Sequence, residues 1–156
     1  MDQGVQTFLV DCMLGRLATW LRLLGLDAPL RHRPPARVAP GQVLITRRTR
    51  LKGRPGVLFI SHDRLGDQLR QVVDSLRLTL EPKRFFTRCL RCNVAVRPLS
   101  REQAGELVPR YTLHTAERFT RCPACGRVYW PGSHTKRAGD VLRAIDPLYL
   151  NREKTT

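Results

Sequence analysis

The sequence predicts an α/β fold with a small, mainly parallel sheet and flanking helices, followed by a C-terminal zinc ribbon. A short apolar strand is expected at 7–10, and continuous apolar runs at 43–46 and 57–61 are typical of strands buried on both faces. Stretches 13–24 and 65–76 carry apolar residues at the three- and four-residue spacing of an amphipathic helix. Two C-x-x-C pairs then follow in the second half of the chain.

The order of these elements favours parallel pairing. The first strand ends at Asp11, and the helix after it ends at Gly25, a residue that commonly stops helices. A second strand is expected at 26–30, whereas the prolines and glycine within 31–41 predict a loop. Strand–helix–strand–strand–strand–helix is the skeleton of a small α/β sheet.

We expect three parts along the chain. Residues 1–82 should form the α/β domain, 83–150 the zinc-ribbon module and 151–156 a frayed tail. Within the second part, a Ser-Arg-Glu-Gln capping box predicts a helix over 100–108, and 138–145 is a candidate for one more helix.

Four of the five cysteines form the two C-x-x-C pairs, Cys89 with Cys92 and Cys122 with Cys125. Two such pairs can supply four thiolates to one tetrahedral Zn²⁺. The interval 93–121 is longer than the simplest spacing rule of about 15–20 residues, so it needs a hairpin or helix of its own. Two disulfides or two redox motifs are the alternatives. We expect structural zinc, because disulfides need a secretory route and no apolar signal segment opens the chain.

The charge of the chain suggests a polyanionic partner. There are 28 Lys+Arg against 13 Asp+Glu, which gives a formal net charge of +15. The 42% hydrophobic content is enough for a packed core, so the chain is not a disordered basic tail. No apolar run approaches the roughly 18 residues of a membrane span, and we expect a cytoplasmic protein without a membrane partner.

The basic residues are clustered. Eight lie between Arg31 and Arg54 and six between Lys83 and Arg101, and neither run contains an acidic residue. A solvated surface usually mixes both signs of charge. Acid-free clusters instead favour a nucleic-acid partner, and a basic surface of this kind could also contact a ribosome, DNA or an anionic membrane surface.

Candidate catalytic residues follow the predicted strands, because ligands of parallel sheets gather beyond the carboxyl ends of the strands. Asp11 follows the first strand, Arg47 and Arg48 follow the run 43–46, and Asp63 comes shortly after the run 57–61. Asp11 is therefore either a ligand for Mg²⁺ or Mn²⁺ or an N-cap of the following helix.

Two widely separated motifs carry a family resemblance. The segment Asp11–Asp27 reads D-C-M-L-G-R-L-A-T-W-L-R-L-L-G-L-D, and Cys122–His134 reads C-P-A-C-G-R-V-Y-W-P-G-S-H. With V-L-I-T-R at Val43–Arg47 and R-C-L-R-C-N at Arg88–Asn93, they resemble the mut-seven C-terminal ribonuclease domains, a divergent branch of the PIN-like nucleases with a fused zinc ribbon. The resemblance covers nearly the whole chain.

The resemblance implies a PIN-like fold, a four-cysteine zinc site and a ribonuclease activity that uses Mg²⁺ or Mn²⁺. Asp11 and Asp27 match family positions, while Asp63 is proposed from its place after a strand. The sequence departs from the family at Arg48, where an Asp is usual, and in 31–42, which lacks the usual acidic helix. An arginine at a cation site replaces attraction by repulsion.

Two classes of function follow: an RNA-cleaving enzyme with a weakened active site, or an RNA- or ribosome-binding module that kept the fold and lost catalysis. Trp130 and His134 are candidates for a base-stacking platform, with packing of the ribbon as the alternative. The candidate RNA-binding residues are Arg16, Arg47, Arg48, Arg50, Trp130, His134, Lys136 and Arg137.

Overall fold

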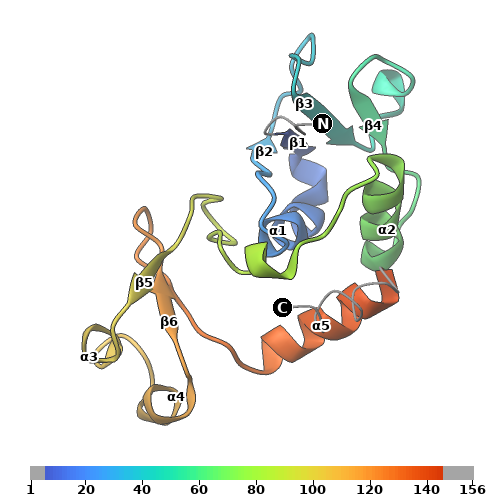
Figure 1. Ribbon diagram of the computed structural model, residues 1–156. Helices are drawn as coiled ribbons and strands as arrows, with labels where there is room; N and C mark the ends of the chain where they lie inside the picture. The colour runs from blue at the N-terminus through green and yellow to red at the C-terminus, as the bar shows by residue number, and fades with distance from the viewer. Residues whose placement is uncertain (1–5, 146–156) are drawn as a thin grey trace.

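The computed structural model describes residues 6–145. Its first half is a four-stranded sheet with two helices, and its second half is a small ribbon followed by a long helix (Figure 1). The first half contains β1 (Thr7–Asp11), α1 (Gly15–Leu23), β2 (Leu30–Arg31), β3 (Gln42–Thr46), β4 (Val57–Phe59) and α2 (Leu65–Ser75). The second half contains β5 (Arg97–Leu99), α3 (Arg101–Ala104), α4 (Arg110–Thr115), β6 (Phe119–Arg121), β7 (Val128–Tyr129) and α5 (Ser133–Ile145). Short 3-10 turns are η1 (Cys12–Leu14), η2 (Thr49–Leu51) and η3 (Pro82–Arg84).

The sheet is parallel throughout, with strand order β2-β1-β3-β4. This confirms the predicted α/β class. The carboxyl ends of β1 and β3 lie side by side, since Val10 pairs with Ile45. As a result, Asp11 and the residues that follow Thr46 meet at one edge of the sheet.

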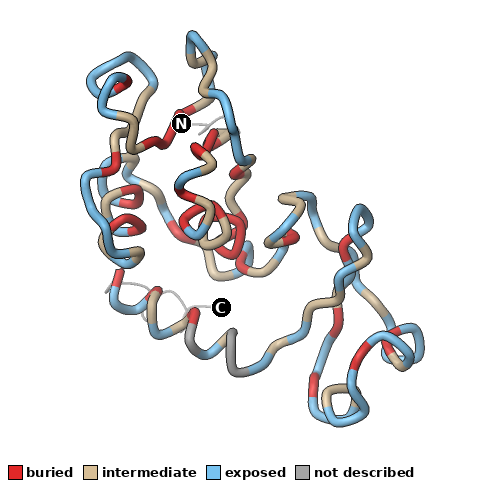
Figure 2. The backbone as a smooth tube through the Cα atoms, turned by 180° about the vertical axis from the view of Figure 1, so that it is seen from behind, coloured by how far each residue is buried: buried red, intermediate tan, exposed pale blue. Residues whose placement is uncertain are grey.

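The two faces of the sheet are covered differently. Phe8, Val10 and Ile45 point to the face on which α1 and α2 pack, and α5 joins the same core through buried Leu142. The other face carries Leu9 and Leu44, which pack with Val38 and Leu51 from the connecting segments and with Val57 of β4. Figure 2 shows that buried residues concentrate in the strands and helices of the first half.

The second strand and the first helix have boundaries that differ from the predicted ones. The predicted strand 26–30 overlaps β2 at Leu30 only, and before it a single bridge joins Asp27 to Thr7. The predicted helix 13–24 begins as η1 and ends at Leu23, and Gly25 follows with a φ of +79°. Residues 32–41 form no helix, as their composition indicated.

The second half is a three-stranded antiparallel ribbon, β5-β6-β7. The capping box is present: Ser100 accepts from the backbone N–H of Gln103, and the Gln103 side chain accepts from the N–H of Ser100. The helix it begins is nevertheless only Arg101–Ala104. The sequence analysis missed α4, whose short length gives little periodicity.

Helix α5 returns from the ribbon to the α/β half (Figure 1). It is longer than the predicted 138–145, and its buried Ala138, Leu142 and Ile145 belong to the main core. By packing, α5 is thus part of the α/β half, whereas the sequence predicts that it belongs to the module 83–150. The predicted frayed tail, 151–156, lies outside the described residues. None of the helices between residues 6 and 145 is long and apolar enough to cross a membrane.

Candidate functional site

The four paired cysteines come together in the ribbon. The sulfurs of Cys89, Cys92, Cys122 and Cys125 all lie within 4.8 Å of one another. A tetrahedral Zn²⁺ with Zn–S bonds of about 2.3 Å places its sulfurs about 3.8 Å apart, and the sulfurs of Cys89 and Cys125 are 3.8 Å apart. The cluster therefore fits a zinc ion.

Local backbone geometry builds this cluster. The N–H of Cys92 donates to the sulfur of Cys89 at 3.3 Å, and the N–H of Cys125 donates to that of Cys122 at 3.4 Å. The residue that follows each C-x-x-C pair has a left-handed backbone conformation, which lets the turn close. These residues are Asn93, with a φ of +67°, and Gly126, with a φ of +74°. Both turns thus point N–H groups at sulfur, which stabilises thiolates.

The thiol groups titrate unequally. Burial by itself raises the pKa of Cys89, but hydrogen bonds from the Tyr129 hydroxyl and from backbone N–H groups outweigh burial and lower its pKa to about 6. The pKa of Cys92 is raised to about 12, mainly by its hydrogen bonding with Cys125. Four thiolates at this spacing repel one another, and a bound dication would remove that repulsion.

A polar network joins the first cysteine turn to the α/β half. Buried Arg22, on α1, donates to the carbonyls of Leu90 and Arg91 at 2.9 Å each. The Asn93 amide donates to Asp27 at 2.6 Å and accepts from the N–H of Ala28 at 3.0 Å. Sequence analysis missed Arg22, because nothing in the pattern of an amphipathic helix distinguishes a buried arginine from an exposed one.

At the carboxyl edge of the sheet, Asp11 makes a buried ion pair. Its carboxylate accepts from Arg48 Nε at 2.5 Å and from Arg48 Nη2 at 3.2 Å, and from the Thr46 hydroxyl at 2.8 Å. The Asp11 side chain is fully buried, while that of Arg48 is 29% exposed. The guanidinium therefore closes the carboxylate off from solvent.

This pairing decides the protonation state of the site. Burial raises the pKa of Asp11, but the hydrogen bonds from Arg48 and Thr46 and the charge of Arg48 together bring it below its ordinary value of 3.8. The same contact raises the pKa of Arg48. Asp11 is thus ionised and fully engaged at neutral pH, and its carboxylate does not cap η1.

The structure does not gather the three candidate acids. Asp63 lies 85% exposed and pairs with Arg47 at 2.6 Å. Asp27 bridges to Thr7 at the opposite end of β1, four residues or about 13 Å along the strand from Asp11. Within residues 6–145, the cysteine cluster is the one group of three or more Cys, His, Asp or Glu at metal-binding distance.

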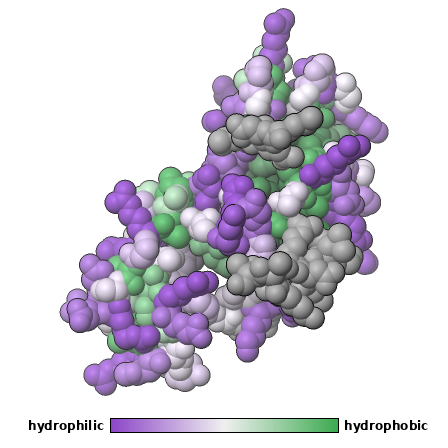
Figure 3. Space-filling model, in the orientation of Figure 1, coloured by the Kyte–Doolittle hydropathy of each residue, from purple (hydrophilic) through white to green (hydrophobic). Residues whose placement is uncertain are grey.

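Most candidate RNA-binding side chains are accessible. Arg16, Arg50 and Lys136 are exposed, Arg47 and Arg48 are half-buried at the carboxyl edge, and Trp130 is 39% exposed. Figure 3 shows hydrophilic side chains around the rim of both halves. His134 and Arg137 belong to α5, but their side chains lie outside what the structure describes.

Comparison with known families fits this arrangement. The model of the Mut7-C RNAse domain matches residues 6–142. The chain belongs to the Mut7-C RNAse domain family. No curated protein and no solved structure matches it. Membership supports a nuclease-like, RNA-related function for this Mut7-C domain, and it agrees with the four-cysteine cluster.

Proposed function

We propose that this Mut7-C domain binds RNA at the carboxyl edge of its sheet and hydrolyses phosphodiester bonds weakly, with Mg²⁺ or Mn²⁺. The observation that carries the proposal is the Asp11–Arg48 pair, which puts a guanidinium against the one acidic side chain that is buried among residues 6–145. Family membership supports hydrolysis of RNA. The positive charge of Arg48 beside Asp11 is the reason why we expect this activity to be weak.

The charges at this edge favour RNA phosphate. The Arg48 side chain remains 29% exposed, and Arg47 and Arg50 lie within two residues of it in the chain. Guanidinium groups bind phosphate oxygens through paired hydrogen bonds. Binding through such contacts releases counterions from the RNA and weakens as salt rises.

The same geometry opposes a divalent cation. Carboxylates are the main protein ligands of Mg²⁺, and both oxygens of Asp11 already accept hydrogen bonds. A cation beside Asp11 would have to displace the guanidinium or lie against its positive charge. A bound metal would supply an activated water and stabilise charge on the phosphate, while Asp11 would hold it and Arg47 would orient the RNA.

The decisive experiment is the substitution Arg48→Asp, which replaces the guanidinium by the acid usual in the family. We expect Mn²⁺ to raise the melting temperature of the variant but not of the parent, because a metal relieves the repulsion between the two carboxylates. We also expect cleavage of a labelled single-stranded RNA to rise by about tenfold or more at millimolar Mn²⁺.

The matched control is Arg50→Asp, which makes the same charge change at an exposed residue that forms no hydrogen bond with Asp11. It should weaken RNA binding without any response to Mn²⁺. The double variant Asp11→Asn with Arg48→Asp should lose both the stabilisation by Mn²⁺ and the increase in RNA cleavage. If Arg48→Asp neither binds Mn²⁺ nor cleaves RNA, the site is not a suppressed metal site.

A second candidate is an RNA- or ribosome-binding module without catalysis. The scattered positions of Asp27 and Asp63 favour it, because Asp11 belongs to no group of three or more potential metal ligands among residues 6–145. It predicts that the parent binds RNA but shows no metal-dependent cleavage, and that Asp11→Asn leaves RNA affinity unchanged.

A further inference from the structure

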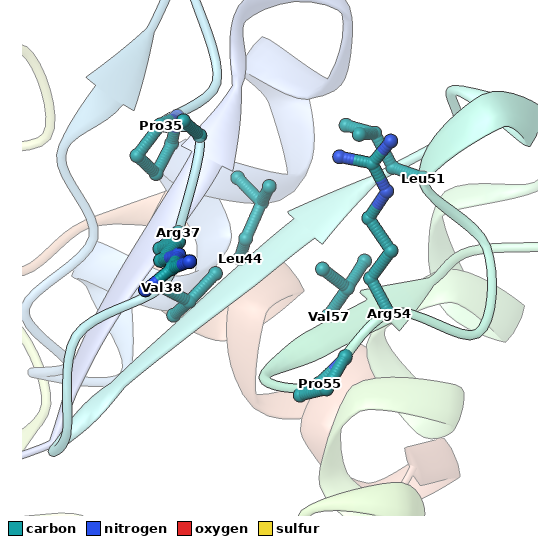
Figure 4. Close-up of a pocket in the computed structure, with 9 residues that line it drawn as sticks. Pro35, Arg37, Val38, Leu44, Leu51, Arg54, Pro55 and Val57 are labelled. Atoms are coloured by element: carbon teal, nitrogen blue, oxygen red, sulfur yellow. The ribbon is translucent and has the colours of Figure 1, made fainter.

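A pocket lies on the face of the sheet that the α-helices leave uncovered. It has a volume of about 320 Å³, and Leu44 of β3 forms part of its floor (Figure 4). Its walls come from residues 35–38 before β3 and, after β3, from Leu51, Arg54 and Pro55 together with Val57 of β4. In Figure 4, Val38 and Val57 border the floor from opposite sides, and the rim carries the guanidinium groups of Arg37 and Arg54.

The pocket is an apolar cavity in a strongly basic setting. No acidic residue occurs between Asp27 and Asp63, whereas eight arginines and lysines do. Both Arg37 and Arg54 are exposed, and neither forms an ion pair with any residue between 6 and 145. A ligand that fits both features has a flat or apolar part and at least one anionic group.

The pocket also adjoins the proposed RNA edge. Alternate residues of a strand point to the same face, so Leu44 and Thr46 share the face that carries the pocket. Thr46 donates to Asp11, and Arg48 pairs with the same carboxylate. Two residues of strand separate the pocket floor from this pair, or about 7 Å.

We propose that this pocket is a subsite that binds one base of single-stranded RNA, while Arg37 and Arg54 contact the flanking phosphates. The proposal rests on RNA binding at the carboxyl edge and names a second contact for the same strand. A phosphate bound at Arg48 and a base bound in the pocket would lie on the same face of the sheet.

The size of the pocket favours a single base over a partner helix. Ligand pockets commonly have volumes of about 300–1,000 Å³, and this one lies at the lower end of that range. It is about half open to solvent, and Val38, Leu51 and Val57 belong to its apolar lining. Apolar walls accept the faces of any base, so the subsite should recognise the presence of a base more than its identity.

The test compares two labelled RNA oligonucleotides of equal length, one with bases and one with abasic sugars at all internal positions. The parent should bind the base-bearing RNA about tenfold more tightly, because removing about 60 Å² of apolar base surface from water favours binding by roughly that factor. Ala36→Leu places a larger aliphatic side chain at the pocket wall without changing charge or adding a ring. It should abolish the preference and leave affinity for the abasic RNA unchanged.

The matched control is Ala39→Leu, an exposed alanine of the same loop that does not line the pocket. It should keep the preference, and equal melting temperatures of the two variants would exclude misfolding. Equal binding of both RNAs by the parent, or an unchanged preference in Ala36→Leu, overturns the subsite but leaves RNA binding at the edge intact. Absence of binding to either RNA overturns the proposed function as well.

Discussion

Arg48 and Asp11 show how one residue changes the chemistry of a site without changing the fold. A buried carboxylate needs a partner, because its desolvation is costly. In this chain the partner is a guanidinium fixed by two hydrogen bonds. The pair therefore leaves no uncompensated charge at this edge of the sheet and places a positive charge beside the carboxylate that a cation would need.

Replacing the partner should make stability depend on pH in a new way. In the parent, the pKa of Asp11 lies below 3.8, so its contribution to stability is complete above that pH and is lost as pH falls through the lowered pKa. In Arg48→Met, burial should raise the pKa of Asp11. The variant should be clearly less stable at pH 7, and the difference from the parent should shrink as pH falls and Asp11 becomes protonated.

Chemical denaturation at pH 7 and at several lower values measures this difference. Arg47→Met is the control, because its partner Asp63 is 85% exposed and such surface pairs contribute about 0–1 kcal/mol. A destabilisation by Arg48→Met that is constant with pH would mean that lost packing, and not an unpaired carboxylate, is its cause.

At the scale of elements, the turn after α1 joins the two halves. Gly25 has a φ of +79°, and a Cβ there would lie 2.2 Å from the carbonyl oxygen of Arg84. The N–H of Phe86 also donates to the carbonyl of Leu23 at 2.8 Å, so the segment after η3 packs closely on the end of the helix.

The variant Gly25→Ala should therefore be much more destabilising than Gly53→Ala. Both glycines have a φ of +79°, so both substitutions carry the cost of a left-handed alanine, about 1–2 kcal/mol. Gly53 has nothing within 4 Å of an added Cβ, whereas Gly25 meets backbone. Thermal unfolding measures the difference, and equal losses of stability would show that the contact with Arg84 relaxes at little cost.

At the scale of the whole molecule, the cysteine cluster should hold the ribbon together. The ribbon core around Ala104, Val108, Ala116 and Phe119 is small, and small modules commonly depend on a metal for folding. Elemental analysis should find about one Zn²⁺ per chain. Chelation should unfold the ribbon and lower the melting temperature of the α/β half, since Arg22 and Asn93 link the halves.

Single cysteine variants distinguish zinc binding by the cluster from a nonspecific effect of removing any thiol group. Cys122→Ser should lose zinc, while Cys12→Ser should retain it, because Cys12 lies beside Asp11 and outside the cluster. A Cys122→Ser protein with full zinc content and unchanged melting would contradict a four-cysteine site.

RNA binding should depend on salt, because the basic residues at the carboxyl edge of the sheet contact phosphate groups. Replacing Arg47 and Arg50 by Gln should weaken binding to every RNA sequence and reduce the slope of log affinity against log salt by about one to two. Titrations between low and moderate salt measure the slope. Arg110→Gln with Arg118→Gln, on the ribbon, tests whether the loss is specific to the sheet edge, and equal effects of both pairs would argue against a localised site.

Local patterns in the sequence determined much of this protein. The apolar runs predicted β1, β3 and β4, because a buried strand needs apolar residues on both faces. The spacing of the cysteines predicted the cluster, because each C-x-x-C turn sets its own geometry. The acid-free segment 31–54 also predicted that no acidic helix would lie before β3.

The tertiary structure decided which distant residues meet. Asp11 and Asp27 were proposed from matching family positions and Asp63 from its place after a strand, but the parallel register places Asp27 at the far end of β1 from Asp11. The same register sets Arg48 against Asp11, 37 residues away in sequence. Such pairings depend on strand order and on which side chain fills a buried position, and neither is encoded in the periodicity of any single segment.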